Sequence, residues 1–325
     1  MLSFDEAMAT VEDGDKPSIL LGNGFSLAWR NDVFNYANLL DVAKFTDREA
    51  EIRKLFTLSG TYDFEAVMRS LIAAKAVLEA YGGNEVLVEM IERDQQLLKD
   101  ALISAISITH PERPRDVTNE QFISVRRFLS RYEQIFTVNY DLLFYWAINK
   151  DNLPPEDYST DDGFRIGCEW QGYGTNQKAH FLHGGLHIFD SGTAIEKHAN
   201  AERGIGIVDL VKANLEKGKF PLFVSEPTST KKKQRIEHNP YLNFCFRELG
   251  RVTGTFFIQG HSMDENDKHI FDQLRRSKVQ KFFVSIFGDE SSEENRRVQA
   301  NAIAYLKSPS SNVEFFDAQS APIWS

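Results

Sequence analysis

SILLGNGFS, at residues 18–26, is the stretch that decides the fold. Its apolar half, Ser18 to Leu21, predicts a short strand, and Gly22-Asn23-Gly24 predicts a tight turn before a helix that begins near Phe25. Glycines at such a turn let backbone N–H groups approach a pyrophosphate, and a helix start adds a partial positive charge. The full dinucleotide-binding fingerprint needs a third glycine where this chain has Leu27, so a plain tight turn is the alternative interpretation.

Three further apolar runs end in polar or glycine-rich residues. They are Thr137-Val138-Asn139-Tyr140-Asp141, Leu182-His183-Gly184 and Gly260-His261-Ser262. In an open parallel sheet, ligands bind beyond the carboxyl ends of the strands. We therefore expect these three strand ends to meet the turn after Leu21 in one pocket and to form a nucleotide site.

Asn139 and Asp141 come directly after the second of these strands. The Asn139 amide can both donate and accept hydrogen bonds, which suits a ribose hydroxyl or a bound water. The Asp141 carboxylate can fix its own loop by accepting backbone N–H bonds. Capping of the following helix is the alternative role for both residues.

His183 lies at the end of the third strand, next to Gly184-Gly185. A neutral imidazole there can act as a general base near neutral pH, and a structural role in the core is the alternative. His187 follows four residues later. No carboxylate or cysteine accompanies this pair at ligand spacing, so we expect no metal site.

The fourth motif, Gly260-His261-Ser262, can hold a ribose or phosphate group through Ser262 and its backbone N–H. The alternative is an ordinary helix start capped by Ser262 or Asp264, with no role in catalysis for His261 or for His269 further on. The lysines at 231–233 could cover a phosphate-bearing ligand, but we interpret residues 227–239 as a solvated polar loop.

Strands and helices alternate along much of the chain, most clearly in its last quarter. The predicted strands are 18–21, 134–138, 180–182, 255–259, 281–287 and 313–316. This order predicts an α/β fold, a Rossmann-like doubly wound parallel sheet with right-handed crossovers, over residues 15–325. Residues 41–129 are expected to form a helical insertion within it, and residues 190–240 a second, less regular one.

The composition is that of an ordinary globular protein, with 325 residues, 42% of them hydrophobic, and a formal net charge of −10. This charge argues against direct nucleic-acid binding over a large face. No apolar run approaches the roughly 18 residues that a membrane span needs, and Met1 to Asp15 lacks a signal-peptide pattern, so we expect a cytoplasmic protein. With Cys168 and Cys245 as the only cysteines, a four-cysteine zinc site and a disulfide framework are excluded.

Taken together and in this order, the four motifs resemble those of the sirtuin-like superfamily. Its pattern is a Gly-x-Gly-x-Ser loop, an Asn-x-Asp loop, a His-Gly catalytic turn and a late Gly-x-Ser. Here they read Gly22-Asn23-Gly24-Phe25-Ser26, Asn139-Tyr140-Asp141, His183-Gly184 and Gly260-His261-Ser262. The chain looks most similar to bacterial zinc-free sirtuin-like proteins, several of which are NAD-consuming effectors of anti-phage defence. The resemblance implies that the first and last motifs bind NAD.

Departures from the deacylating sirtuins are informative. Those enzymes carry a four-cysteine zinc ribbon, which this chain cannot build. They have a glutamine where this chain has Val138, and a Pro-Asp-Phe-Arg segment where it has Trp29-Arg30-Asn31-Asp32. These differences argue against peptide deacylation and leave the NAD site in place.

The resemblance implies a NAD glycohydrolase that cleaves the nicotinamide–ribose bond. The leaving group is already cationic, so no general acid is needed, and the site must bind an oxocarbenium-like ribose better than the ground state. Asn139 would orient the ribose and the attacking water, His183 would take a proton, and Asp141 would hold the Asn139 loop.

Two other functions stay open at this point, a non-catalytic sensor of NAD or an ADP-ribose derivative and a NAD-dependent protein deacylase. A permanently active NAD hydrolase would drain its host, so we expect regulation. The resemblance suggests a homo-oligomer or a hexameric ATPase partner of the HerA type, with the helical insertion at 41–129 as the contact surface.

Overall fold

The computed structural model describes residues 1–325 except 13, 31–38, 112, 151, 166–167, 199–205, 225 and 227, and it leaves the side chains of 65, 107, 109, 173, 207 and 208 undescribed. Asn31 and Asp32 of the segment compared with Pro-Asp-Phe-Arg therefore lie outside the described residues. So does part of the second insertion expected at 190–240.

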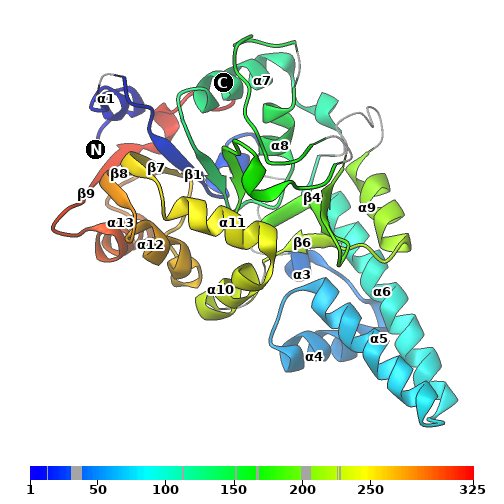
Figure 1. Ribbon diagram of the computed structural model, residues 1–325. Coiled ribbons are helices and arrows are strands. Elements are labelled where there is room, and N and C mark those ends of the chain that lie inside the picture. Colours follow the sequence, from blue (N-terminus) through cyan, green and yellow to red (C-terminus); the bar gives the residue numbers. More distant parts are fainter. Residues whose placement is uncertain are drawn as a thin grey trace.

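A six-stranded parallel sheet forms the centre of the molecule (Figure 1). Its strands, in spatial order, are β3 (Ala179–Phe181), β2 (Ile135–Thr137), β1 (Ser18–Leu21), β7 (Thr253–Gln259), β8 (Lys278–Ile286) and β9 (Asn312–Asp317). Counted within this sheet, the order is 3-2-1-4-5-6, which is that of dinucleotide-binding Rossmann folds. The predicted fold class is confirmed. The strand order reverses between β1 and β7, because β2 and β3 lie on one side of β1 and the strands from β7 onward lie on the other.

Helices cover both faces of this sheet (Figure 1). One face carries α1 (Phe4–Met8), α7 (Asn119–Leu129) and α8 (Leu143–Ile148). The opposite face carries α11 (Pro240–Leu249), α12 (Lys268–Leu274) and α13 (Glu293–Leu306). The Phe4 ring illustrates the first layer, because it contacts Phe128 of α7, Phe257 of β7 and Phe316 of β9.

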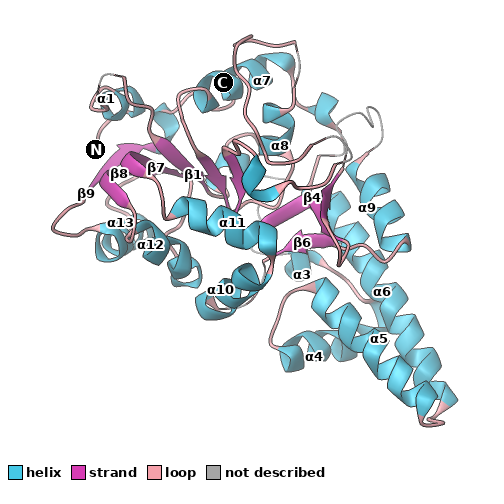
Figure 2. Cartoon of the chain, viewed as in Figure 1, coloured by secondary structure: helices cyan, strands magenta, loops and turns pink. Residues whose placement is uncertain are grey.

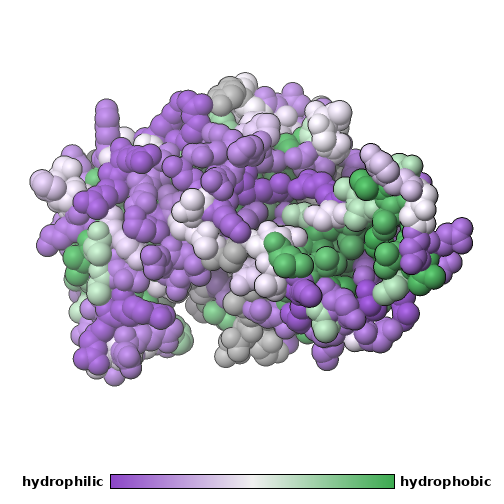
Figure 3. All heavy atoms as spheres, turned by 90° about the horizontal axis from the view of Figure 1, so that it is seen from below, coloured by the Kyte–Doolittle hydropathy of each residue, from purple (hydrophilic) through white to green (hydrophobic). Residues whose placement is uncertain are grey.

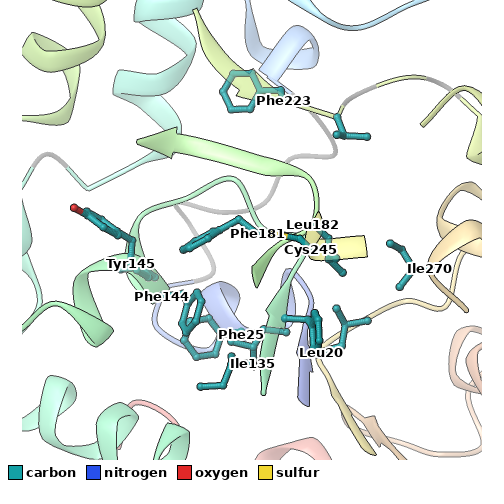
Figure 4. Close-up of a cluster of buried hydrophobic side chains, with 14 of the residues drawn as sticks. Leu20, Phe25, Ile135, Phe144, Tyr145, Phe181, Leu182, Phe223, Cys245 and Ile270 are labelled. Atoms are coloured by element: carbon teal, nitrogen blue, oxygen red, sulfur yellow. The ribbon is translucent and has the colours of Figure 1, made fainter. Parts of the chain in front are cut away.

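The core between β1, β2, β3 and the neighbouring helices is made of large apolar side chains (Figure 4). Leu20 and Ile135 come from the adjacent strands β1 and β2, and Phe144 of α8 lies 5.3 Å from Phe181 of β3 between ring centroids. Phe25, directly after the first turn, is fully buried. Burial of this apolar surface fixes the register of the short strands whose ends form the site.

A helical segment separates β1 from β2 in the sequence (Figure 2). It contains α3 (Leu39–Val42), α4 (Glu49–Ser59), α5 (Phe64–Ala80) and α6 (Glu85–Thr109) before α7. Helices α5 and α6 pack side by side and project away from the sheet (Figure 1). The 3₁₀ turns η1 (Thr46–Arg48) and η2 (Pro114–Asp116) flank this segment.

A small antiparallel sheet lies between β3 and β7 in the sequence. Its order is β5 (Ile195–Lys197), β4 (Gly184–Asp190) and β6 (Pro221–Phe223). The helices α9 (Ile207–Glu216) and α10 (Ser229–His238) accompany it. Residues 186–189 belong to β4 and therefore to this second sheet.

The expected polar loop at 227–239 is wrong, because residues 229–238 form helix α10. Thr228 caps this helix by accepting a hydrogen bond from the Lys231 backbone N–H, and Ile236 is its buried anchor. A single apolar side chain among charged ones leaves too weak a periodicity to reveal a helix. The 3₁₀ turn η4 (Glu265–Asp267) directly precedes α12.

Two short 3₁₀ turns complete the described structure, η3 (Gly172–Gly174) and η5 (Ala318–Ser320). Among the helices that the structure describes, none combines the length and apolarity required to cross a bilayer.

Candidate functional site

The loops after β1 and β7 touch each other through their backbones where the strand order reverses. Gly22 N–H donates to the Gln259 carbonyl at 2.9 Å, and Gly24 N–H donates to the Gly260 carbonyl at 2.8 Å. A Cβ added at Gly24 would lie 2.5 Å from the Gly260 Cα, and Gly260 itself has a φ of +67°. Both glycines are therefore required by this close approach and by a left-handed backbone.

The loop after β2 joins this pair through a buried hydrogen-bond network. The Asn139 Nδ2 group donates to the Gly22 carbonyl at 3.0 Å and to Ser26 Oγ at 3.1 Å. The Ser26 hydroxyl donates to Asp141 Oδ2 at 2.6 Å, and Asp141 Oδ1 accepts from Leu143 N–H at 2.9 Å. One network thus connects the first two motifs, which lie more than 110 residues apart in the chain.

Asp141 is buried at the cavity wall, and this burial determines the direction of its pKa shift. Desolvation raises the pKa of Asp141 to about 6, against the lowering effect of the hydrogen bonds from Ser26 and Leu143. The carboxyl group is fully bonded within the protein on both oxygens, which is the arrangement expected of a residue that holds the Asn139 loop.

His183 follows β3 and lies on the wall of the same cavity. Its Nε2 atom is 3.4 Å from His269 Nε2 and 3.9 Å from Asp267 Oδ1. Burial holds the pKa of His183 well below its usual range, with the nearby Asp267 acting in the opposite direction. The imidazole is therefore neutral near pH 7 and carries one nitrogen with a free electron pair.

The Asp267 carboxylate lies at the centre of a cluster of imidazole and ammonium groups. Lys232 Nζ lies 2.7 Å from its Oδ1, and His261 Nε2 lies 3.4 Å from its Oδ2. His261 Nδ1 accepts the Met263 N–H at 2.9 Å, so the His261 proton is on Nε2 and faces the carboxylate. Burial acts to raise the pKa of Asp267, but His261, His183 and Lys232 hold it well below its usual value.

These loops enclose one cavity of about 1220 Å³ beyond the carboxyl ends of the central strands. Eight predicted site residues line it: Asn23, Gly24, Asn139, Asp141, His183, Gly260, His261 and Ser262. Gly22, Phe25 and Ser26 lie behind its wall. The Phe25 carbonyl accepts a 2.7 Å hydrogen bond from Trp324 Nε1, which ties the turn to the end of the chain.

The first turn differs from the sequence expectation in one respect. The helix that follows it, α2 (Gly24–Leu27), has only four residues and no side-chain cap from Asn23. So short a helix provides little macrodipole. Backbone N–H groups at the turn, and not a helix dipole, are what this loop offers to a phosphate group.

Residues 19–324 match the family model described as a domain of unknown function, DUF4917. The chain belongs to the DUF4917 family. A comparison with curated proteins found no match.

Several solved structures of Sir2 proteins are similar to this DUF4917 chain over most of its length. A structure on the mechanism and regulation of Sir2 enzymes is 10% identical over 99% of this chain and 94% of that one, with a TM-score of 0.41. Sir2Tm bound to a propionylated peptide is 12% identical and Sir2 bound to acetylated peptide is 13% identical. Each covers 93% of this chain and 98% of the other, with a TM-score of 0.38.

Three groups near His183 in the DUF4917 chain have no role assigned from the sequence. Asp267 and Lys232 line the cavity, and His269 lies beside His183. Asp267 of η4 and Lys232 of α10 come to the cavity from a different part of the fold than β3, and His269 belongs to α12, directly after η4. The expectation of no metal rested on the sequence neighbours of His183 and His187, and the fold brings a carboxylate to His183 from 84 residues away. His187 instead stacks on the Tyr145 ring at 4.1 Å, inside the core.

Proposed function

We propose that this protein is a NAD glycohydrolase that cleaves the nicotinamide–ribose bond. The observation that carries the proposal is the position of the cavity. It lies beyond the carboxyl ends of β1, β2, β3 and β7, where a 3-2-1-4-5-6 sheet reverses its order and where Rossmann folds bind dinucleotides. The sequence resemblance to zinc-free sirtuin-like proteins selects cleavage over other uses of NAD.

Substrate binding in this proposal uses the paired loops after β1 and β7. Backbone N–H groups at Asn23 and Ser262 approach the pyrophosphate and a ribose, because the glycines beside them leave room for the ligand. A volume of about 1220 Å³ exceeds that of ordinary small-molecule pockets and accommodates a dinucleotide.

Chemistry in this proposal takes place between Asn139 and His183. Water attacks the anomeric ribose carbon, the carbon–nitrogen bond breaks, and nicotinamide leaves with the bonding electron pair. Both Asn139 amide hydrogens are used inside the protein, so its Oδ1 atom is the group that accepts a hydrogen bond from the water. His183 takes the proton released by the water, and Asp267, 3.9 Å away, stabilises the imidazolium that forms.

Nicotinamide release by the purified protein, followed by chromatography, tests this proposal. We expect release by the wild type and a loss of at least about 100-fold in the His183→Ala and Asn139→Ala variants, the usual scale for general base catalysis. His238→Ala is the matched control, because His238 is exposed on α10, and it should turn over NAD at the wild-type rate. Wild-type turnover by His183→Ala would contradict the role of His183.

A non-catalytic sensor of NAD or an ADP-ribose derivative is the second candidate. One observation favours it: His183 Nε2, the atom that would take the proton, already lies 3.4 Å from His269 Nε2. Calorimetric binding of NAD to the wild type, with no product after long incubation, would support the sensor.

We further propose that the protein is a regulated effector of bacterial anti-phage defence that acts as a homo-oligomer or with a HerA-type ATPase. The sequence resemblance is the support for this role. Exposed apolar side chains on the α4–α6 segment supply a candidate contact surface (Figure 3).

A further inference from the structure

A cluster of three possible metal ligands lies beside the cavity. His183, Asp267 and His269 each offer one ligand atom, and these three atoms lie within 4.8 Å of one another. Asp267 and His269 lie two residues apart at the junction of η4 and α12, whereas His183 follows β3, 84 residues before Asp267. Such convergence needs an explanation beyond local sequence.

The separation of the two imidazoles fits tetrahedral coordination. Zinc–nitrogen bonds of about 2.0–2.1 Å at a tetrahedral angle place two nitrogens about 3.4 Å apart. His183 Nε2 and His269 Nε2 are 3.4 Å apart. Asp267 Oδ1, at 3.9 Å from His183 Nε2, needs to move towards the two imidazoles to complete the third corner.

Two of the three groups have the supporting hydrogen bonds that metal ligands use. Ser229 Oγ lies 3.1 Å from His269 Nδ1, and this contact leaves Nε2 of His269 facing His183. His261 Nε2 faces the other oxygen of Asp267. Outer partners of this kind orient the first ligands and are themselves important for affinity.

We propose that His183, His269 and Asp267 bind one transition-metal ion of the Zn²⁺ type, with its fourth position open to the nucleotide cavity. The donor set of two imidazoles and one carboxylate is a common one for such ions. The bound ion takes the electron pair of His183 Nε2 and so holds catalysis off. Inhibition by the bound ion rests on the proposed NAD cleavage, whereas metal binding itself does not.

Lys232 occupies the position where a bound cation would contact Asp267. Its Nζ atom lies 2.7 Å from Asp267 Oδ1, the oxygen nearest His183, so the ammonium group competes with a cation for that oxygen. Lys232→Met removes the competitor while keeping most of the side-chain volume. The geometry therefore predicts that losing a positive charge tightens metal binding at this position.

Binding of Co²⁺, followed by its visible absorption and displaced by Zn²⁺, is the experiment. We expect one ion per wild-type chain, affinity lower by at least about 10-fold in His269→Ala, and higher affinity in Lys232→Met. His238→Ala on α10 is the control and should match the wild type. Circular dichroism of each variant checks its fold, and Lys232→Met tests the site by a gain that a misfolded protein cannot give.

Wild-type affinity in His269→Ala, or no bound Co²⁺ in the wild type, would overturn the metal site. Unchanged or weaker binding by Lys232→Met would overturn the assignment of Asp267 as a ligand. Nicotinamide release with and without added Zn²⁺ then tests inhibition separately. Metal binding by the wild type, together with no NAD turnover by its metal-free form, would refute the proposed function and leave the metal site standing.

Discussion

At the residue scale, the site depends on a pair of glycines that let two loops touch through their backbones. Gly24 and Gly260 approach so closely that neither tolerates a Cβ without movement of the other loop. Asn139 and Ser26 then connect the loop after β2 to this pair. The residues expected to bind NAD therefore also hold the central strand ends together.

Gly24→Ala is expected to destabilise the fold by about 1–3 kcal/mol, the range for an added methyl group in a packed position. Urea denaturation measures the change. Gly174→Ala is the control, because a Cβ there meets nothing within 4 Å, and its midpoint should match the wild type. Equal urea midpoints for Gly24→Ala and Gly174→Ala would show that the two loops can move apart without a loss of stability.

Ser26→Ala removes the hydroxyl that donates to Asp141 and accepts from Asn139. We expect a loss of about 1–3 kcal/mol in unfolding free energy, because Asp141 Oδ2 is left buried without this donor. The pKa of Asp141 should also rise further above about 6, since the hydrogen bond from Ser26 lowers it. Carboxyl titration by NMR measures that shift, and a lower pKa in the variant would contradict the network.

The sequence around the site residues predicted their local roles but not their contacts with distant parts of the chain. Asn139 and Asp141 could be recognised as loop or cap residues from their place after a strand, and Asp141 does accept the Leu143 N–H. Their bonds to Gly22 and Ser26 could not, because no local pattern encodes a partner 113 to 117 residues away. The same limit concealed Asp267 and His269 as neighbours of His183.

At the element scale, the periodicity of apolar residues predicted strands and helices well where many of their side chains are buried. Strand β1 occupies the predicted residues, Ser18 to Leu21. The sequence did not predict helix α10, because Ile236 is its single buried side chain and provides no apolar periodicity. The capping residue Thr228 is a weak signal in a polar stretch. Its Lys232 reaches the cavity, so this error also hid a site residue.

The tip of the α5–α6 pair is the element to test for assembly. Tyr81 is 88% exposed and Val86 is 61% exposed, so large apolar side chains face solvent on both sides of the turn between these helices. We expect the double variant Tyr81→Ser and Val86→Ser to form a smaller oligomer than the wild type in light scattering, with NAD binding retained. Equal size in both proteins would remove this surface from the account.

At the scale of the whole molecule, buried histidines should make stability depend on pH. Burial lowers the pKa of His110 to about 4 and that of His180 to about 3. The unfolded chain binds protons at these side chains below about pH 6.5, whereas the folded chain does not, so unfolding free energy falls as the pH drops from about 6.5 towards 4. Asp141, with its raised pKa, offsets part of this loss between about pH 6 and 4.

Urea denaturation at pH 7.5 and pH 5 measures the effect. Each of the two histidines contributes at most a few kcal/mol, from about 1.4 kcal/mol per unit of pKa difference. A lower midpoint at pH 5 is the expected result. A midpoint that is higher at pH 5 would mean that these histidines are not buried as neutral groups.

The doubly wound parallel class of the central sheet was predictable because strands and helices alternate along the chain, whereas its strand order was not predicted. The small antiparallel sheet β5-β4-β6 was not predicted, since its short strands lie in a stretch of mixed charge without clear alternation. The reversal between β1 and β7 is the feature that brings the four motifs together, and it rests on pairings across more than 200 residues.

Crystals of the His183→Ala variant grown with NAD test the central claim most directly, because this variant should bind NAD without cleaving it. We predict intact NAD in the cavity, with its pyrophosphate over the Gly22–Gly24 turn and its nicotinamide ribose facing Asn139. NAD bound at another place, or no binding at concentrations that saturate the wild type in calorimetry, would contradict the account.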